Sequence, residues 1–369
     1  MEFIPKVVGR GISDLERSLL SLPCRLGGMG IQIPTETAAQ AYNDSIYITE
    51  PLVKKIKEND LYLDHKTLSE IEKRKRQRMK INDDSSLRKQ EEILRQLPDH
   101  LKRLTNLNSE KGSSIWLTTL PLIQCGFHLN KRTFIDALCM RYDWPVKDMP
   151  RSCACGQQNS LEHALSCKMG GYVIKRHNEI RDLEAELLSE VCVDVKRKPQ
   201  LIPLTGEPIR GNQASEARLD VSAVGLWAPN ERSFMDVRIF SPMCKSYLGR
   251  EPEEVYRSHE NQKKRDYNDR VINVERATFS PLIISTTGGW GKEAHAFHRR
   301  LALLIAEKRK DDFANVMSFI RKRIRFNLLR TTLLTLRGNR QTRQKKHEQN
   351  LNYRILDIYF NLVDISTQN

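Results

Sequence analysis

The sequence has no long hydrophobic run and no apolar leader. No stretch of about 18 apolar residues occurs in the 369 residues, so a membrane-spanning helix is not expected. The first ten residues, MEFIPKVVGR, lack the apolar core of a secretory signal. We therefore expect an intracellular protein without a membrane partner.

Cysteine is also scarce, with eight residues in the whole chain. Intracellular thiols stay reduced, and a chain of this length can bury a core without cross-links, so a disulfide framework is not expected. Five of the cysteines are scattered and are expected to be ordinary buried side chains: Cys24, Cys125, Cys139, Cys192 and Cys244.

Two enzymatic motifs are missing. The reverse-transcriptase box needs an aromatic residue and an apolar strand around two aspartates, and neither INDDS nor RKDDF provides them. TTGGWGKEA is not a phosphate-binding loop, because Thr286 replaces its first glycine and Glu293 replaces the Ser or Thr after Lys292. We expect no polymerase activity from this chain, no small-molecule substrate, and a turn after a strand at TTGGWGKEA.

Positive charge is abundant and uneven. The net charge is +15, and the segment from Arg299 to Lys346 holds fifteen Lys and Arg against three acidic residues. Such an excess favours a polyanionic partner, of which nucleic acid is the commonest inside cells. The alternative is an ordinary solvated helix surface.

Three cysteines and a histidine gather in RSCACGQQNSLEHALSC. Cys153, Cys155, His163 and Cys167 have the spacing C-x-C, seven residues, H, three residues, C. Zinc takes four nitrogen or sulfur ligands in a tetrahedron, and two close pairs joined by a short loop can supply them. His163 and Cys167 are four residues apart and would share one face of a helix. We predict a structural Zn²⁺ site with no position open for catalysis; the alternative is a set of buried thiols.

The remaining pattern predicts an α+β protein. Apolar spacing indicates a short helix after Ser13, helices around a turn at 82–86 in the charged region 54–97, and a packed helical layer at 115–145. The expected order beyond the cysteines is helix 174–192, strand 217–226, strand 233–240, helix 251–275, strand 278–286, helix 292–309 and helix 311–336. Strands flanked by helices indicate a compact mixed domain.

Two aspartates interrupt successive apolar strands. Asp220 lies in ARLDVSAVGLW, and Asp236 lies in SFMDVRIF. Alternation places Asp236 with Phe234, Arg238 and Phe240 on one strand face. Aspartate is disfavoured within strands and costly to bury unpaired, so the pair suggests a divalent-metal site.

The following helix carries two lysines near the stripe that faces the sheet. Lys264 lies on the stripe with Tyr256, Glu260 and Tyr267, and Lys263 lies at its edge. An amine turned towards the carboxylates could hold a water molecule and the scissile phosphate. The alternative is a surface salt-bridge network.

These motifs together resemble the C-terminal region of non-LTR retrotransposon proteins that carry a restriction-like endonuclease. The resemblance is carried by CACG…EHALSC, GGYVIKRHNEIRDLEAELL, RLD with Asp236 after fifteen intervening residues, KKRDY and FSPLIISTTGGWG. LERSLLSLPCRLGGMGIQIP is similar to the stretch that follows the reverse transcriptase in such elements. The family combines a CCHC zinc knuckle with an endonuclease of the PD-(D/E)XK superfamily.

The resemblance implies roles for individual residues. Asp220 and Asp236 would bind catalytic Mg²⁺, and Lys264, with Lys263 a close second, would be the relocated lysine of the family. Glu179, beside His177, would be the extra acidic residue of some members; apart from the resemblance, His177 could meet the helix that carries the lysines. Leu219 departs from the family's proline. Arg238 departs from the usual lysine, which leaves the chemistry to the helix lysine because arginine does not readily release a proton.

The resemblance also implies a function and partners. The chain would be an Mg²⁺-dependent DNA endonuclease acting in the nucleus, which frees a 3′-hydroxyl that primes reverse transcription. Its partners would be DNA, element RNA and a reverse transcriptase domain encoded in the same or an upstream reading frame. A set of basic residues would contact nucleic acid: Arg238, Arg321, Lys322, Arg323 and Arg325. The alternative is a catalytically inactive, zinc-containing nucleic-acid-binding module.

We divide the chain accordingly into five parts. These are a post-polymerase helical segment at 1–50, a helical linker region at 51–148, the zinc knuckle at 149–172, the endonuclease domain at 173–310 and a basic helical tail at 311–369.

Overall fold

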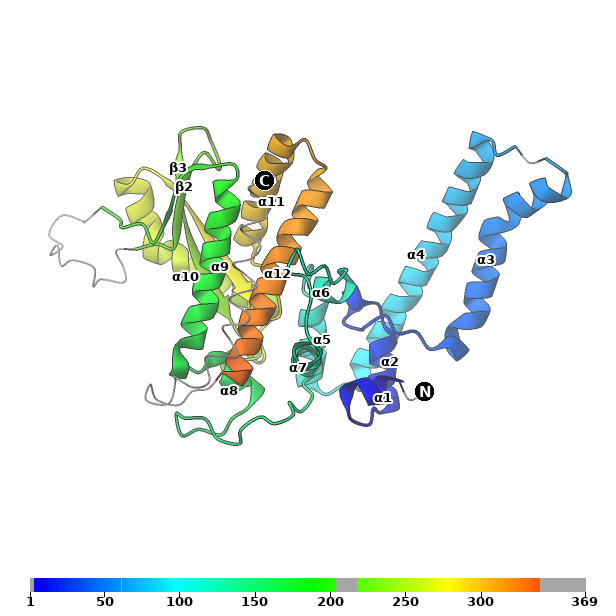
Figure 1. Ribbon diagram of the computed structural model, residues 1–369, viewed down its shortest axis with the longest axis horizontal. Coiled ribbons are helices and arrows are strands. Elements are labelled where there is room, and N and C mark those ends of the chain that lie inside the picture. The colour runs from blue at the N-terminus through cyan, green and yellow to red at the C-terminus, as the bar shows by residue number, and fades with distance from the viewer. Residues whose placement is uncertain (1–2, 61, 203–217, 339–369) are drawn as a thin grey trace. The chain divides into compact units, whose positions relative to one another are not determined.

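The computed structural model describes residues 3–60, 62–202 and 218–338 (Figure 1). The chain forms two compact units, Met1–Ser109 and Glu110–Asn369. The described part of the first unit is helical, and the second contains helices and a mixed four-stranded sheet. The predicted α+β class is thus confirmed, whereas the division into five parts stays a prediction. Part of the predicted strand 217–226 and most of the tail, 339–369, lie outside the described residues.

The first unit begins with short helices and continues with two long ones. Ser13 and Glu16 form the predicted capping box at the start of α2. The bounds of the elements are α1 Phe3–Val8, α2 Asp14–Ser21, the 3₁₀ turn η1 Cys24–Leu26, α3 Pro34–Lys57, α4 His65–Gln96 and α5 Asp99–Ser109.

The predicted turn at 82–86 is wrong, because α4 runs through these residues without interruption. Asn82 donates a hydrogen bond of 2.9 Å to the buried Asp44 of α3, and Asp83 lies 2.6 Å from Arg25. These contacts with α3 and η1 offset the low helix propensity of Asn, Asp and Ser. Tertiary packing, which is absent from local sequence patterns, therefore decides the conformation here.

Pro51 lies inside α3 and removes one helical hydrogen bond. Proline has no backbone N–H, so the carbonyl of Tyr47, four residues earlier, loses its usual partner. Arg74 of α4 donates to that carbonyl at 2.9 Å and also stacks over the Tyr47 ring. The guanidinium of Arg74 thus replaces the backbone N–H donor that the Tyr47 carbonyl lacks because of the proline.

Gly28 lets the chain after η1 pack directly on α2. A Cβ atom at Gly28 would lie 2.0 Å from the carbonyl oxygen of Leu22 and 2.7 Å from that of Leu19, whereas one at Gly11 would meet nothing within 4 Å. We expect Gly28→Ala to lower the free energy of unfolding by about 2–3 kcal/mol, because backbone atoms must shift. Gly11→Ala should change it by less than about 1 kcal/mol. Chemical denaturation of both variants, followed by circular dichroism, tests this; equal effects would contradict it.

The second unit carries the sheet. Its strands lie in the order β1-β2-β3-β4, with β1–β2 and β2–β3 antiparallel and β3–β4 parallel. The bounds are α6 Ile115–Thr118, α7 Lys131–Tyr142, α8 Leu161–Ser166, the 3₁₀ turn η2 Met169–Gly171, α9 Tyr172–Ser189, β1 Val193–Arg197, β2 Val221–Val224, β3 Arg232–Phe240, the 3₁₀ turn η4 Lys245–Tyr247, α10 Pro252–Asp269 with a π-helical turn Arg270–Val274, β4 Thr278–Ser285, α11 Lys292–Arg309 and α12 Phe313–Arg337. The predicted helices and strands beyond the cysteines are found, and β1 is an additional strand that we did not predict.

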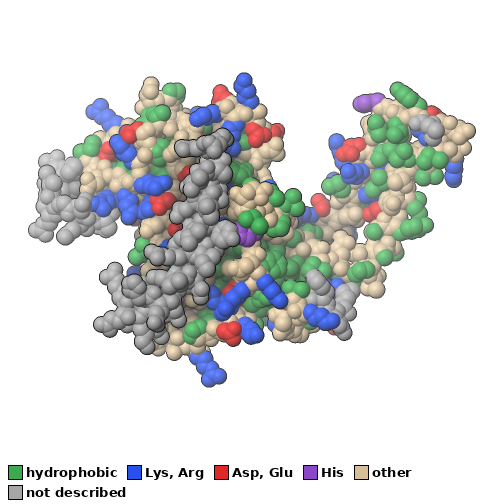
Figure 2. Space-filling view, viewed as in Figure 1, with side chains coloured by type: hydrophobic (Ala, Val, Ile, Leu, Met, Phe, Trp, Pro, Cys, Tyr) green, Lys and Arg blue, Asp and Glu red, His purple; other side chains and the backbone are tan. Residues whose placement is uncertain are grey.

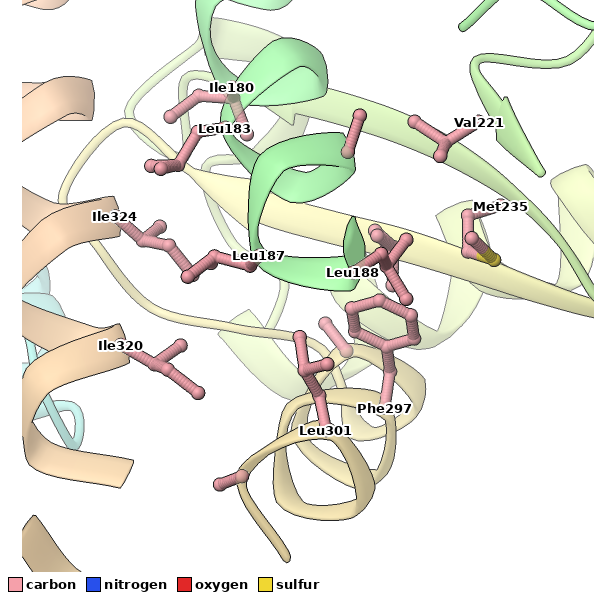
Figure 3. Close-up of a cluster of buried hydrophobic side chains, with 14 of the residues drawn as sticks. Ile180, Leu183, Leu187, Leu188, Val221, Met235, Phe297, Leu301, Ile320 and Ile324 are labelled. Atoms are coloured by element: carbon pink, nitrogen blue, oxygen red, sulfur yellow. The ribbon is translucent and has the colours of Figure 1, made fainter. Parts of the chain in front are cut away.

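Helices cover both faces of this sheet. On one face, Val221 and Met235 pack with side chains of α9, α11 and α12, including Leu188, Phe297 and Ile320 (Figure 3). On the opposite face, Phe240 of β3 and Ile283 of β4 pack against Val255 and Tyr256 of α10. This confirms the predicted alternation along β3, which places Asp236 on the α10 side.

The loop between β4 and α11 is the turn predicted at TTGGWGKEA. Gly288 has a φ of 103°, a conformation that favours glycine. Gly291 lies against Glu260 of α10, whose Oε1 accepts a hydrogen bond of 2.9 Å from the backbone N–H of Glu293. The loop thus joins β4 to α11, and α10 caps the new helix.

α12 contributes to the core of this unit. Val316, Ile320, Ile324 and Leu328 lie in the same buried cluster as the sheet. α12 packs along α9, and the two lie side by side in Figure 1.

Candidate functional site

The four predicted metal ligands lie together in the second unit. One ligand atom from each of Cys153, Cys155, His163 and Cys167 lies within 4.8 Å of all the others. The Sγ atoms of Cys153 and Cys167 are 3.8 Å apart, and Cys155 Sγ is 3.3 Å from His163 Nε2. A tetrahedral ion with bonds of about 2.3 Å to sulfur separates two sulfur ligands by about 3.8 Å. The cluster could therefore hold a metal ion such as zinc.

Local hydrogen bonds build this cluster from a small hairpin and one helical turn. Gly156, with a φ of 87°, turns the chain so that its N–H donates to the Cys153 carbonyl at 2.9 Å. Ser160 caps α8 by accepting from the His163 N–H. α8 ends at Ser166, but the Cys167 N–H still donates to the His163 carbonyl at 2.8 Å, which keeps the two ligands on one side. Within the described residues, no other group of three or more His, Cys, Asp or Glu side chains could hold a metal ion.

Contacts of α8 attach the cysteine cluster to α9 and to the segment after β3. Glu162 accepts a hydrogen bond of 3.1 Å from the Lys245 N–H, which follows β3. The buried Arg176 of α9 donates to the Leu165 carbonyl at 3.2 Å. A metal ion here would brace a segment that joins α9 to the region after β3.

Asp220 lies where β2 begins, beside β3. The last β2–β3 pair is Val221 with Met235, and continuing that register would place Asp220 opposite Asp236. Asp220 Oδ2 accepts a hydrogen bond of 2.8 Å from the Val237 N–H. The carboxylate therefore takes the place of a strand carbonyl at the point where the ladder of β2 stops.

Asp236 points from β3 towards α10 and meets Lys263. Lys263 Nζ is 2.7 Å from Asp236 Oδ2, in an ion pair rather than a well-directed hydrogen bond. The Asp236 side chain is only 8% exposed. Burial raises the pKa of Asp236 to about 6; the charge of Asp220 adds to the rise, and Lys263 and His177 oppose it. At neutral pH the carboxylate is still mostly ionised, so it can bind a cation.

The structure brings Lys263, rather than Lys264, to Asp236. Lys264 makes an ion pair with Glu293 at the start of α11. Arg238 donates to Gln262 of α10 at 2.8 Å. Asp236 is therefore paired with Lys263, the second of the two lysines named from the sequence.

His177, and not Glu179, is the side chain of α9 at this site. His177 Nε2 lies 3.1 Å from Asp220 Oδ2 and 3.0 Å from the Val237 carbonyl oxygen. Burial lowers the pKa of His177, but the hydrogen bond to Asp220 and the charges of both aspartates raise it by more, so the net change is upwards. Glu179 is exposed, and residues two apart lie on opposite sides of a helix.

The helical period of α9 distinguishes His177 from Glu179 in the sequence itself. His177 precedes Ile180 by three residues and Leu187 by ten, so the three side chains fall on one stripe of the helix, and both apolar members are buried. Glu179 falls off that stripe. The periodicity therefore favours His177 over Glu179 as the residue that faces the sheet.

The basic residues predicted to contact nucleic acid on α12 are largely engaged within the protein. Arg325 is buried, donates from Nε to the Ser113 carbonyl at 2.9 Å, and has its pKa lowered to about 9 by burial. Arg323 contacts both carboxylate oxygens of Glu186, and Arg321 lies over the Trp290 ring. Lys322 is half-buried. Arg325 is therefore not on the surface that we predicted, because α12 is a core helix.

On the face drawn in Figure 2, Lys and Arg side chains are dispersed among acidic, hydrophobic and other side chains. The burial of Arg325 and the contacts of Arg321 and Arg323 within the protein make the excess of positive charge in the sequence of α12 a poor guide to the location of a basic surface.

Comparison of the chain with models of known protein families gives no match, and a search of curated proteins gives none either. Across the described ranges, no helix is both long and apolar enough to cross a lipid bilayer.

Proposed function

We propose that this chain is a metal-dependent DNA endonuclease of the PD-(D/E)XK type, from a non-LTR retrotransposon protein. The observation that carries the proposal is the buried Asp236, which pairs with Lys263 and lies near enough to Asp220, opposite it in the β2–β3 register, for the charge of Asp220 to raise its pKa. The order α9–β1–β2–β3–α10–β4 supports it, because nucleases of this type use a mixed sheet between helices. Four of the motifs that resemble the family lie on or beside these elements: GGYVIKRHNEIRDLEAELL, RLD, KKRDY and FSPLIISTTGGWG.

The two carboxylates suit Mg²⁺. Magnesium is usually held by one or two carboxylates and otherwise by water and substrate phosphate, so two protein ligands are enough. Asp220 and Asp236 would hold the ion. When bound, it would polarise the phosphodiester and stabilise the charge that develops on its oxygens.

Lys263 would add a positive charge from the protein itself beside the bound metal ion. Its amine lies at the carboxylate that would bind the cation, so a phosphate bound there would come within its reach. It could then donate hydrogen bonds to the scissile phosphate or orient the attacking water molecule. Arg238 can add charge but does not readily exchange a proton.

The cysteine cluster would hold a structural Zn²⁺, since all four tetrahedral positions would be filled by protein atoms. The freed 3′-hydroxyl would prime reverse transcription of element RNA by a polymerase domain encoded in the same or an upstream reading frame, in the nucleus.

The two lysines provide a test of this proposal. We expect Lys263→Ala to lower the rate of Mg²⁺-dependent nicking about a hundredfold or more, because an electrostatic contact to the phosphate is lost. Lys264→Ala should lower it less than about fivefold, since a surface ion pair with Glu293 contributes little. Single-turnover nicking of supercoiled plasmid measures both. A larger loss in Lys264→Ala than in Lys263→Ala would contradict the assignment of Lys263.

A further inference from the structure

One carboxylate oxygen of Asp220 receives two hydrogen bonds. Oδ2 accepts from the Val237 N–H at 2.8 Å, and His177 Nε2 is 3.1 Å away. His177 Nε2 is also 3.0 Å from the Val237 carbonyl oxygen. A carbonyl oxygen can only accept, so Nε2 carries a hydrogen and is the donor. The protonated nitrogen of His177 is therefore fixed by its surroundings.

His177 and Asp220 together replace a missing strand residue. The β2–β3 ladder ends at Val221 and Met235, so β2 offers no partner to the backbone of Val237. Asp220 accepts from the Val237 N–H, and His177 donates to the Val237 carbonyl. Backbone groups in a protein interior need such partners. The contact of His177 is thus made to the strand and to the carboxylate at once.

The arrangement leaves the other oxygen of Asp220 available. Among the described residues, Asp220 Oδ1 has no hydrogen-bond partner, whereas Oδ2 has two. A carboxylate held by one oxygen has little freedom to rotate, so the position of the second oxygen is also set.

We propose that His177 is a positioning residue for the cation site: it fixes Asp220 through Oδ2 and so directs Oδ1 to the divalent ion. This inference rests on the proposed function, because it assumes that Asp220 and Asp236 bind that ion. The required property is an N–H donor at the distance of Nε2 from the backbone. Glutamine can place an amide N–H there, whereas asparagine is one carbon too short.

The experiment compares His177→Asn with His177→Gln in the full chain, with its cysteine cluster loaded with zinc. The probe is Mn²⁺, whose affinity is measured by isothermal titration calorimetry without DNA. We expect His177→Asn to weaken Mn²⁺ binding about 10- to 100-fold, as is usual when a partner of a metal ligand is lost. His177→Gln should recover most of that affinity. Glu179→Gln, two residues along the same helix, is the control and should bind as the wild type does.

Every outcome of this experiment either supports or overturns the positioning role of His177. Equal weakening in both His177 variants, or none in either, would overturn the proposal, and so would a His177→Asn chain that fails to fold, because the role would then be structural. Thermal unfolding of each variant identifies that case. Binding of Mn²⁺ that depends on His177 without nicking of DNA would support the positioning role and remove the nuclease function. Nicking of DNA by a chain whose Mn²⁺ binding does not depend on His177 would support the nuclease function and overturn the positioning role.

Discussion

Asp236→Asn should abolish Mg²⁺-dependent nicking by this chain and leave its binding to DNA intact. Asp236 would be a ligand of the cation, and loss of that ion removes several kcal/mol of transition-state stabilisation. About 4 kcal/mol corresponds to about a thousandfold in rate, so a loss of at least that size is expected. Nicking of supercoiled plasmid in Mg²⁺ measures the rate, and a filter-binding assay in Ca²⁺ measures DNA affinity. A variant that nicks within tenfold of the wild-type rate would refute the assignment of Asp236.

The stability of the Asp236→Asn variant shows whether a loss of nicking comes from unfolding. Burial holds the pKa of Asp236 at about 6, against 3.8 for an unperturbed aspartate, so the folded chain binds this proton more tightly than the unfolded chain. As the pH rises from about 4 to 6, this carboxyl ionises in the unfolded chain while it is still protonated in the folded chain, so the free energy of unfolding falls. The full decrease, about 2–3 kcal/mol, persists above pH 6. Asparagine avoids that decrease, in which the opposing attraction of Lys263 is already included. We expect a gain of about 2–3 kcal/mol at pH 8 without added metal, shrinking towards pH 4.

Cys155→Ser should remove bound zinc from the chain. The wild type should contain one zinc ion per chain, because Cys153, Cys155, His163 and Cys167 supply a complete ligand set. Cys155 is exposed, so its replacement loses a ligand with little loss of packing. Loss of a structural zinc ion destabilises the fold, because binding of the metal contributes to the free energy of folding. We expect a loss of about 2–3 kcal/mol, which at about 2–4 °C for each kcal/mol lowers the thermal midpoint by about 5–10 °C.

Cys125→Ser is the matched control for this experiment. Cys125, which we expected to be buried, is also exposed, and it lies outside the cluster. Elemental analysis should find unchanged zinc in Cys125→Ser and almost none in Cys155→Ser. Equal zinc content in the two variants would show that the cluster does not bind the metal as described.

Local sequence patterns predicted the elements that carry the site. Alternation along β3 placed Asp236 on the side of Phe240, where α10 packs. The spacing of the cysteines and His163 predicted a group that the fold assembles within 4.8 Å. These predictions depend on strand and helix periods, which are fixed by the backbone.

Other features depended on how whole elements pack. Lys263 and Lys264 are adjacent, and their helical positions differ by about 100°, so only the placement of α10 against β3 shows which one meets Asp236. Arg325 reads as a surface charge in the sequence but becomes buried because α12 enters the core. The continuity of α4 through Asn82 likewise required its partner Asp44. Contacts between distant segments set each of these outcomes.

The most direct test of the central claim is a nicking assay on supercoiled plasmid with the purified, zinc-loaded chain. We expect open-circular DNA in the presence of Mg²⁺ and none with EDTA, and the nicks should carry 3′-hydroxyl ends that a DNA polymerase extends without prior phosphatase treatment. Absence of cleavage in both Mg²⁺ and Mn²⁺ on many DNA sequences, with DNA binding retained, would contradict the proposed nuclease function and favour a nucleic-acid-binding module without catalysis.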